Sequence, residues 1–349
     1  MKSDVIIIGA GAVGLACAEA LCARGARVTV VERGLCGNEA SWAGGGILSM
    51  LPPWGYSDDV ARLALRGAAL FGPWAGALHS ATGIDPEYEP SGMLVLPPLD
   101  LAKAEAWCAA HAFHAQRDPS SGGLLLPGVA QVRNPRLMRA LRSRVEALGG
   151  RIVERCEVQA VITAEGRVSA LQTTCGEFAA DHIILTAGAW SRQVLGNHAL
   201  HLDIAPVRGQ MLLFKFNNPP IAHILLQGDL YLIPRRDGHL LVGSTMENAG
   251  FDKSTTAAAR DDLRRRATAI LPSLEAMPLV QHWAGLRPGS PGNIPYIGRH
   301  PTLANLYINS GHFRYGVTMA KASAEILMNE LDGTPQPFDV SPYRAERIR

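Results

Sequence analysis

The sequence carries little charge, and its positive and negative charges nearly balance. Lys and Arg total 33 and Asp and Glu total 31, which gives a formal net charge of +2 over 349 residues. A chain without a basic or acidic excess offers no electrostatic reason to bind nucleic acid or an acidic membrane. Its hydrophobic content of 47% and charged content of 18% are typical of a soluble globular enzyme.

Long apolar runs and closely spaced cysteines are also missing. No apolar run reaches the roughly 18 residues of a membrane-spanning helix, and the first strand is predicted to begin at residue 4, where a signal peptide would lie. Neither the cysteines nor the eleven histidines have a metal-ligand spacing. We therefore expect no metal site, reduced thiols and a cytoplasmic location. The six cysteines are Cys17, Cys22, Cys36, Cys108, Cys156 and Cys175.

Glycine, by contrast, is frequent, and the most informative glycines lie near the start of the chain. An apolar run over residues 4–8 predicts a buried strand, and it leads directly into the G-x-G-x-x-G motif of residues 9–14. A helical pattern follows, and then a second strand over 27–31 that ends at Glu32. Strand, glycine motif, helix, strand and acid together predict a dinucleotide-binding βαβ unit.

Each residue type in this unit has a physical reason. Gly9 permits a tight turn, Gly11 allows the backbone to approach a pyrophosphate, and Gly14 lets the helix pack closely on the strand. The helix N-terminus offers unpaired N–H groups to the phosphates, and Glu32 is placed to accept hydrogen bonds from ribose hydroxyls. The motif by itself does not distinguish FAD from NAD.

A second glycine-rich stretch, residues 37–48, follows this unit. Three successive glycines at 44–46 exclude a strong helix interior. The stretch is either a flexible loop or backbone that runs along a flat cofactor, and its position directly after the second strand favours the cofactor. The turn of residues 186–191 follows a later strand and also has a nucleotide-facing pattern.

The remaining pattern predicts a mixture of helices and strands. Helices are expected over 57–81, 100–111, 134–148 and 256–271, with a final helix that opens near 311 and ends near 331. Strands are expected at 92–96, 151–154, 158–163, 168–173, 183–185 and 306–309. Short strands at 207–216, 221–226, 230–234 and 239–242, with a D-G turn, predict an antiparallel sheet. Residues 114–130 are expected to be a loop.

At this point the sequence resembles a known family. It is similar to the glycine oxidases of bacterial thiamine biosynthesis, within the D-amino-acid-oxidase-like FAD-dependent oxidoreductases. The resemblance extends from the N-terminus to about residue 330, and one departure is Tyr315, where the family motif GHxRNG has Asn. The matching stretches are GAGAVGLACAEAL, Glu32, EASWAGGGIL, TAGAWS, PVRGQML, YLIPRRDGHLLVGSTME, HWAGLRPGSPGNIPYIG and GHFRYGV.

The resemblance implies a two-domain α+β fold. A Rossmann-like FAD-binding domain would comprise residues 1–82, 131–205 and 283–349. A substrate domain built on the antiparallel sheet would comprise residues 83–130 and 206–282.

The resemblance further implies non-covalent FAD, because no cysteine lies where related sarcosine oxidases attach their flavin. The main chain of Val158 would contact the adenine, and residues 312–318 would place N–H groups near the pyrimidine edge of the flavin. The complete set of expected cofactor residues is Gly9, Gly11, Ala12, Val13, Gly14, Glu32, Arg33, Ala40, Ser41, Gly45, Gly46, Ile47, Val158, Gly188, Arg287, His312, Phe313, Arg314, Tyr315, Gly316, Val317 and Thr318.

For the substrate, the resemblance implies that Arg287 binds a carboxylate, since a guanidinium pairs bidentately with that group. Tyr231 and Arg314 would assist, and Met246 and Ile47 would form apolar walls near the substrate Cα. On the residues alone, Arg287 could be a surface arginine, Tyr231 a sheet aromatic and Arg314 part of a structural ion pair. His312 is expected to be a structural or flavin-side hydrogen-bonding group rather than a base.

The expected reaction is the oxidation of glycine by O₂ to glyoxylate, ammonia and hydrogen peroxide, with an imine that could feed thiazole synthesis. The resemblance also suggests a homotetramer. Three alternatives remain open. They are an oxidase of sarcosine, D-amino acids or other N-substituted glycines, a dehydrogenase that reduces a quinone, and a flavin-binding subunit without turnover.

Overall fold

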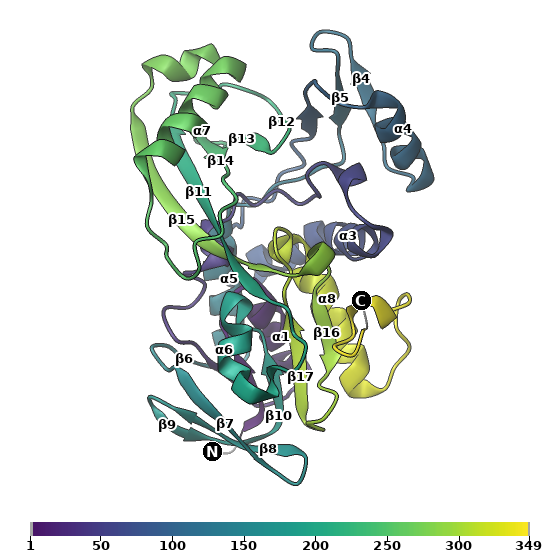
Figure 1. Ribbon diagram of the computed structural model, residues 1–349, viewed down its shortest axis with the longest axis vertical. Coiled ribbons are helices and arrows are strands. Elements are labelled where there is room, and N and C mark those ends of the chain that lie inside the picture. The colour runs from purple at the N-terminus through teal and green to yellow at the C-terminus, as the bar shows by residue number, and fades with distance from the viewer. Residues whose placement is uncertain (1–2, 348–349) are drawn as a thin grey trace.

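The computed structural model describes residues 3–347 and contains three β-sheets with helices packed around them (Figure 1). The helices are α1 (Ala12–Cys22), α2 (Ala40–Ala43), α3 (Asp58–Thr82), α4 (Leu101–Ala110), α5 (Asn134–Ala147), α6 (Ser191–Leu195), α7 (Ala257–Ile270) and α8 (Gly316–Asp332). The strands are β1 (Ser3–Ile8), β2 (Val28–Val31), β3 (Met93–Val95), β4 (Gln116–Asp118), β5 (Gly123–Leu126), β6 (Arg151–Val153), β7 (Val158–Ala164), β8 (Arg167–Thr173), β9 (Gly176–Phe178), β10 (Ala180–Leu185), β11 (Ala205–Lys215), β12 (Ile224–Gln227), β13 (Leu230–Pro234), β14 (His239–Gly243), β15 (Leu279–Gly289), β16 (Tyr296–Arg299) and β17 (Leu306–Ser310).

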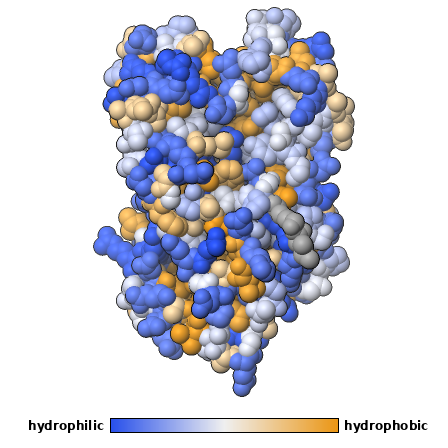
Figure 2. All heavy atoms as spheres, viewed as in Figure 1, coloured by the Kyte–Doolittle hydropathy of each residue, from blue (hydrophilic) through white to orange (hydrophobic). Residues whose placement is uncertain are grey.

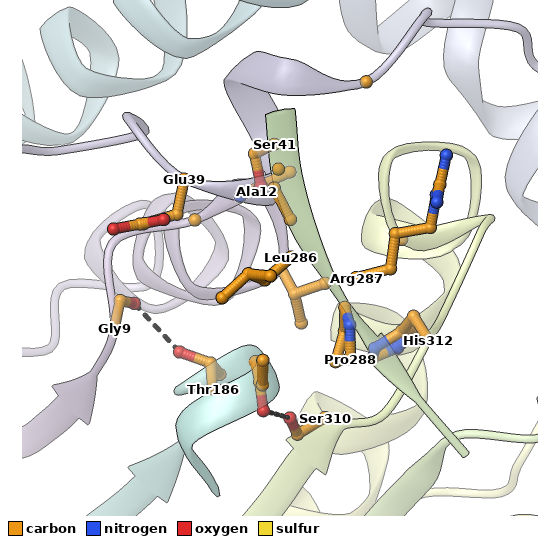
Figure 3. Close-up of a pocket in the computed structure, with 18 of the residues that line it drawn as sticks. Gly9, Ala12, Glu39, Ser41, Thr186, Leu286, Arg287, Pro288, Ser310 and His312 are labelled. Atoms are coloured by element: carbon orange, nitrogen blue, oxygen red, sulfur yellow. Dashed lines mark hydrogen bonds between the residues drawn. The ribbon is translucent and has the colours of Figure 1, made fainter. Parts of the chain in front are cut away.

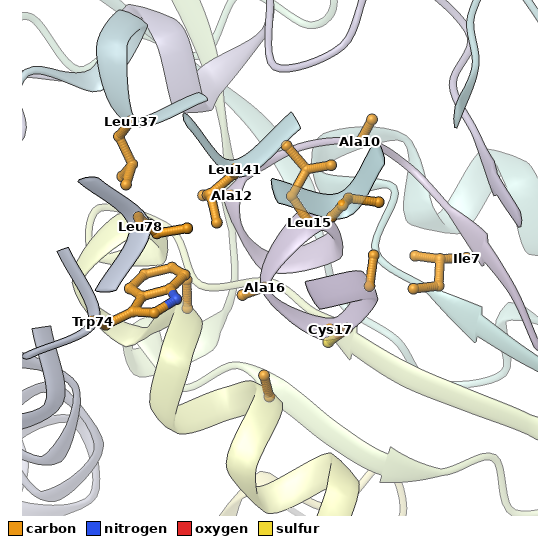
Figure 4. Close-up of a cluster of buried hydrophobic side chains, with 14 of the residues drawn as sticks. Ile7, Ala10, Ala12, Leu15, Ala16, Cys17, Trp74, Leu78, Leu137 and Leu141 are labelled. Carbon is orange, nitrogen blue, oxygen red and sulfur yellow. The ribbon is translucent and has the colours of Figure 1, made fainter. Parts of the chain in front are cut away.

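The six-stranded sheet contains the N-terminal βαβ unit. Its order is β16-β17-β10-β1-β2-β6, and β1 pairs in parallel with both β2 and β10. The central strand β1 is buried on both faces, as its apolar run predicts. On one face, α1 packs with α8, α3 and α5, where Leu15, Trp74 and Leu141 meet in one apolar cluster (Figure 4). The carboxyl ends of β1, β2 and β10 therefore open at the same edge.

The eight-stranded sheet is mainly antiparallel, with the order β15-β11-β14-β13-β12-β3-β5-β4 and a single parallel pair, β12 with β3. The helix α7 covers part of one face, where Leu263 and Ala267 pack against Leu212 and Phe214. The long strands β11 and β15 run from this sheet toward the six-stranded sheet (Figure 1). The α+β fold with an antiparallel second sheet is confirmed.

One expectation about the second sheet was wrong, and one predicted domain boundary falls within a strand. Residues 114–130 were expected to be a loop, but they contain the short strands β4 and β5, which pair with each other and with β3. The predicted domain boundary between residues 282 and 283 falls inside β15. A continuous strand therefore belongs to both predicted domains, and the domain boundaries remain a prediction.

A small third sheet, β7-β8-β9, packs near the end of the βαβ unit. On the face shown in Figure 2, hydrophilic and hydrophobic residues are interspersed. Among the helices of residues 3–347, none combines the length and the apolar character that a membrane-spanning helix needs. Within the same range, no group of three or more His, Cys, Asp or Glu side chains is arranged to hold a metal ion.

Candidate active site

A cavity of about 510 Å³ lies where the two larger sheets meet, and it has the size of a small-molecule or cofactor site. Figure 3 shows residues from the βαβ unit, from β15 and from the segment before α8 around it. The predicted residues that line it are Gly9, Gly11, Ala12, Val13, Glu32, Arg33, Ala40, Ser41, Gly45, Gly46, Ile47, Val158, Gly188, Tyr231, Arg287, His312, Phe313, Arg314, Tyr315, Gly316, Val317 and Thr318.

At the end of the cavity nearest β1, the wall is mostly main chain. Gly9 has a φ of +108°, and a Cβ there would lie 2.6 Å from the carbonyl oxygen of Thr186. The Thr186 hydroxyl lies 2.9 Å from the carbonyl oxygens of both Ile8 and Gly9, which joins the ends of β10 and β1 (Figure 3). These contacts hold the turn so that α1 begins at the cavity, where its first N–H groups can meet an anion.

Gly14 has a different role from the other motif glycines. It does not line the cavity, and a Cβ there would overlap the carbonyl oxygen of Gly9. Its place in the motif is therefore explained by close packing of α1 against the turn, and the expectation of a direct cofactor contact is corrected.

Glu32 and Ser41 also line the end of the cavity nearest β1. The Glu32 carboxylate accepts hydrogen bonds from the N–H groups of Ala10 and Gly34, both at 2.8 Å, so it holds the glycine turn and also faces the cavity. Ser41 Oγ accepts the N–H of Ala12 at 2.9 Å. The Arg33 guanidinium lies 4.0 Å from the centre of the Trp190 ring, which lines the same end.

The glycine segment 44–46 is held along the cavity by two side chains that sequence reasoning missed. The side-chain N–H₂ of Asn134 donates to the carbonyl oxygens of Ser41 at 2.7 Å and Gly44 at 3.0 Å. Arg235 donates to the Gly45 carbonyl oxygen at 2.7 Å, and burial lowers the pKa of this arginine to about 10. The segment is therefore fixed backbone rather than a flexible loop.

The opposite end of the cavity is formed by charged and aromatic side chains. Arg287 on β15 donates to Ser244 Oγ at 2.6 Å and to the Thr245 carbonyl oxygen at 3.1 Å. Burial lowers the pKa of Arg287, and the nearby Arg314 adds to this effect. Within residues 3–347 no acidic side chain forms an ion pair with Arg287, so this end of the cavity holds an uncompensated positive charge.

Arg287 reaches this position because Gly209 leaves room for it. A Cβ on Gly209 would overlap the Arg287 guanidinium. The signal was present in the sequence, since a glycine inside the strand motif PVRGQML is typical of close approach by another group. Gly209 nevertheless had no assigned role, because the partner lies on the neighbouring strand.

Three tyrosines surround the second arginine. Arg314 donates to the hydroxyl of Tyr56 at 3.4 Å. The Tyr315 hydroxyl accepts the N–H of Leu51 at 3.2 Å, and the Tyr56 and Tyr315 rings meet edge to face. Tyr231 is buried on β13, with its hydroxyl 3.8 Å from the sulfur of Met211. The departure from the family motif at Tyr315 therefore joins the start of α8 to the segment around Leu51.

His312 lies against the cavity as a buried, neutral group. Its Nε2 lies 2.8 Å from Ser323 Oγ, and burial lowers the pKa of His312 to about 3. This environment agrees with the expected structural role, because a histidine that stays neutral at pH 7 and is bonded to a serine is a poor proton shuttle.

Met246 is not where it was expected. It is 49% exposed and does not line the cavity, because the chain after β14 bonds to β11 through the bridge between Arg208 and Glu247. Met211, which is buried on β11, lines the cavity instead. The assignment of Met246 as a wall of the substrate site is therefore corrected.

Residues 4–330 match the family model described as FAD dependent oxidoreductase. The chain belongs to this family. It is 41% identical to a glycine oxidase of Pseudomonas putida, with 99% of each chain covered. It is 31% identical to a bifunctional protein ThiO/ThiG of Trichormus variabilis over 94% of its own length and 52% of that protein. It is also similar to the crystal structure of a glycine oxidase from Geobacillus kaustophilus, with a TM-score of 0.94, 26% identity and coverage of 100% and 99%.

The cavity of this FAD-dependent oxidoreductase fits the dinucleotide. A Cβ on Gly11 would lie 3.1 Å from Ser41 Oγ and fill the space beside the helix N-terminus, where a pyrophosphate needs close access to backbone. A Cβ on Gly45 would meet the Ile233 side chain at 2.6 Å. These glycines therefore let the backbone pack closely around the cavity, whose lining extends from Glu32 to Arg287.

Proposed function

We propose that this protein oxidises glycine to an imine that hydrolyses to glyoxylate and ammonia, with O₂ reduced to hydrogen peroxide, and that it accepts similarly small amines, such as sarcosine and D-alanine, in the same reaction. When bound, FAD supplies the redox chemistry by accepting a hydride from the substrate Cα. The observation that supports this most directly is Arg287, a partly buried cation without an acidic partner among the described residues, at one end of a dinucleotide cavity. The similarity to glycine oxidases supports the choice of amine.

Within this proposal the protein binds and orients the substrate. Arg287 pairs with the substrate carboxylate, and Tyr231 donates its hydroxyl to the same group. Arg314 provides a second positive charge, while Ile47 and Met211 limit the space beside Cα. No residue is needed as a general base, because an amine that binds in its neutral form can release hydride directly.

We further propose that the FAD is non-covalent and that the protein acts in the cytoplasm, as a homotetramer by resemblance. The ThiO/ThiG relative suggests that the imine can pass to thiazole synthesis. Acid precipitation tests the cofactor proposal. Released flavin is expected in the supernatant, whereas yellow colour in the pellet would show a covalent link.

The substrate is tested by mixing the protein anaerobically with a panel of amines and following flavin bleaching. Overpacking a filled site by a few methylenes costs about 1–3 kcal/mol, or roughly one to two decades in rate. Glycine and sarcosine should therefore bleach the flavin fast, D-alanine more slowly and bulky D-amino acids poorly.

L-amino acids should fail, since their hydrogen would point away from the flavin. Faster bleaching by D-phenylalanine or by any L-amino acid than by glycine would favour a broader oxidase. Peroxide release and dye reduction, measured in parallel, distinguish an oxidase from a dehydrogenase. A flavin that no amine bleaches would indicate a binding subunit without turnover.

A further inference from the structure

We propose that Cys156 and Cys175 form a peroxide-sensitive thiol pair, which closes to a disulfide and changes the adenosine end of the cofactor cavity. The identity of the oxidant rests on the proposed function, since peroxide is the product of that reaction. The pair itself rests on the geometry of the third sheet, where the two cysteines meet at the turn between β8 and β9.

The Cys156 and Cys175 thiols lie beside the same neighbouring groups. Thr173 Oγ1 lies 3.3 Å from the sulfur of Cys156 and accepts the N–H of Cys175 at 3.1 Å. The Cys175 sulfur lies 3.7 Å from the carbonyl oxygen of Arg155, the residue directly before Cys156. Segments 155–157 and 173–175 are joined by hydrogen bonds between Glu157 and Thr174, both at 3.0 Å. These bonds keep the two cysteines on adjacent backbone segments.

The environments of the two sulfurs suit different roles. All six cysteines lie in the described part of the chain, and Cys175 is the exposed one, whereas Cys156 is only 1% exposed. Burial raises the pKa of the Cys156 thiol, and contact with the Cys175 thiol raises it further. Cys175 is therefore accessible to peroxide from solvent. The raised pKa of Cys156 makes it the slower nucleophile, so it acts second, on the oxidised Cys175 sulfur beside it.

The chemistry is balanced with peroxide as the oxidant. The Cys175 sulfur attacks one peroxide oxygen, the O–O bond breaks, and one water leaves as Cys175 becomes a sulfenic acid. The Cys156 sulfur then attacks the Cys175 sulfur, the S–O bond breaks, and a second water leaves with the thiol proton. Two thiols lose two electrons in total, and one peroxide gains them. A reducing cytosol restores the thiols by exchange.

Formation of the disulfide between Cys156 and Cys175 is expected to alter the cofactor cavity. Cys156 lines the cavity together with Glu157 and Val158. Its N–H donates to the carbonyl oxygen of Glu32 at 2.8 Å, and the N–H of Arg155 donates to that of Gly34 at 2.9 Å. A disulfide brings the two sulfurs from contact to bonding distance, so the segment around Cys156 that lines the cavity must adjust. Because the same segment is bonded to Glu32, we expect weaker FAD binding and slower turnover in the oxidised protein.

The experiment uses the FAD-bound protein. It is treated with hydrogen peroxide, alkylated, digested and examined by mass spectrometry, and retained FAD is measured after gel filtration. The expected result is a peptide pair linked through Cys156 and Cys175, lost on treatment with dithiothreitol, together with a several-fold rise in the FAD dissociation constant. Cys175→Ser, a change at an exposed position, should keep its FAD affinity after peroxide, and the control Cys108→Ala, in a separate cluster, should behave as wild type.

Three outcomes would overturn the proposal. These are recovery of both cysteines as alkylated thiols, Cys175 linked only to another chain, and Cys175 oxidised to sulfinic acid beside a free Cys156. An unchanged FAD affinity in the linked protein would overturn the coupling to the cavity. A separate arm adds glycine and oxygen with or without catalase. If glycine fails to bleach the flavin, the proposed function fails, while added peroxide still tests the thiol pair.

Discussion

The two ends of the cofactor cavity are built from different parts of the protein chain. At the end near β1, the cavity is lined mostly by main chain, and a Cβ on several of its glycines would overlap neighbouring atoms. At the end near β15, the cavity is lined by side chains, including the partly buried cations Arg287 and Arg314 and the buried tyrosines Tyr231 and Tyr315. The end near β1 is suited to a dinucleotide, a ligand that many enzymes bind. The end near β15 is suited to one particular substrate.

This difference explains what each end should tolerate. A main-chain site depends on steric fit, so adding one carbon can abolish the fold around it. A side-chain site depends on charge and hydrogen bonds, so its loss should leave the protein folded and able to bind FAD. Each of the four changes below tests this contrast at one end of the cavity.

The largest effect is expected from Gly14→Ala. Its new Cβ would overlap the carbonyl oxygen of Gly9, and neither backbone segment can move without opening β1 from α1. We expect loss of at least about 3 kcal/mol of folding free energy, more than ordinary overpacking costs, and loss of FAD. Denaturant unfolding and the flavin spectrum measure both.

The matched control is Gly76→Ala, inside α3, where a Cβ would meet nothing within 4 Å. There alanine should stabilise the helix by roughly 0.5–1 kcal/mol. If Gly14→Ala kept its FAD and its stability, the main-chain account of this end would be wrong.

Next in size is Arg287→Ala. Loss of a buried charge-assisted pair costs about 2–5 kcal/mol, or roughly two to four decades in kcat/KM. The protein should still bind FAD with an unchanged spectrum, because the glycine motif, Glu32 and the main chain of residues 312–318 are expected to make most of the dinucleotide contacts. Steady-state kinetics with glycine and a flavin titration check the two parts separately.

Arg260→Ala is a suitable control for that substitution, since Arg260 is exposed on α7 and bonds only its neighbour Asp261 among the contacts described. It should retain wild-type kinetics. A turnover of Arg287→Ala within a few-fold of wild type would remove this arginine from the substrate site.

The contrast between the two ends also explains how much the sequence could predict. The steric requirements of the main-chain end appear as glycines at fixed spacing, so Gly9, Gly11 and Glu32 could be assigned a place from the pattern alone. Arg287 could not, because its partners Ser244 and Thr245 lie on a distant segment, and the family resemblance was needed to select it.

Errors occurred where tertiary pairing decides the structure. The strands β4 and β5 have only three and four residues, and they are ordered by pairing with each other and with β3 rather than by a strong pattern of their own. Met246 was expected to line the substrate site. The bridge between β11 and Glu247 instead places its segment away from the cavity. Asn134 and Arg235 were missed because their function is to hold backbone, which leaves no motif.

A third effect depends on pH and concerns His312. Burial lowers its folded-state pKa to about 3, against about 6.5 in an unfolded chain. The neutral form is therefore favoured by folding, and its contribution to stability is complete above pH 6.5 and is lost as the pH falls toward 3. The slope is about 1.4 kcal/mol per pH unit in that window.

Urea unfolding between pH 7 and pH 4 should show a shallower acid loss for His312→Gln, which cannot take up the proton. His79→Gln, at an exposed position on α3, should follow the wild-type curve. Parallel curves for wild type and His312→Gln would show that this histidine is not held neutral by the fold.

The smallest effect is expected at Tyr315, the departure from the family motif. Tyr315→Phe removes the hydroxyl that accepts the N–H of Leu51, and an unpaired buried donor costs about 1–3 kcal/mol. Tyr315→Asn, the family residue, also loses the ring contact with Tyr56. We expect both variants to keep FAD and remain active, because the main chain of residues 312–318 is expected to supply the cofactor contacts.

The stability loss should appear in denaturant unfolding, while Tyr88→Phe, on a partly exposed ring stacked on Phe71, should change little. Loss of flavin or of all activity in Tyr315→Asn would show that the side chain has become essential. A side chain at the substrate end, and not only the main chain there, would then help to hold the cofactor, and side-chain changes at that end could no longer be expected to leave FAD binding intact.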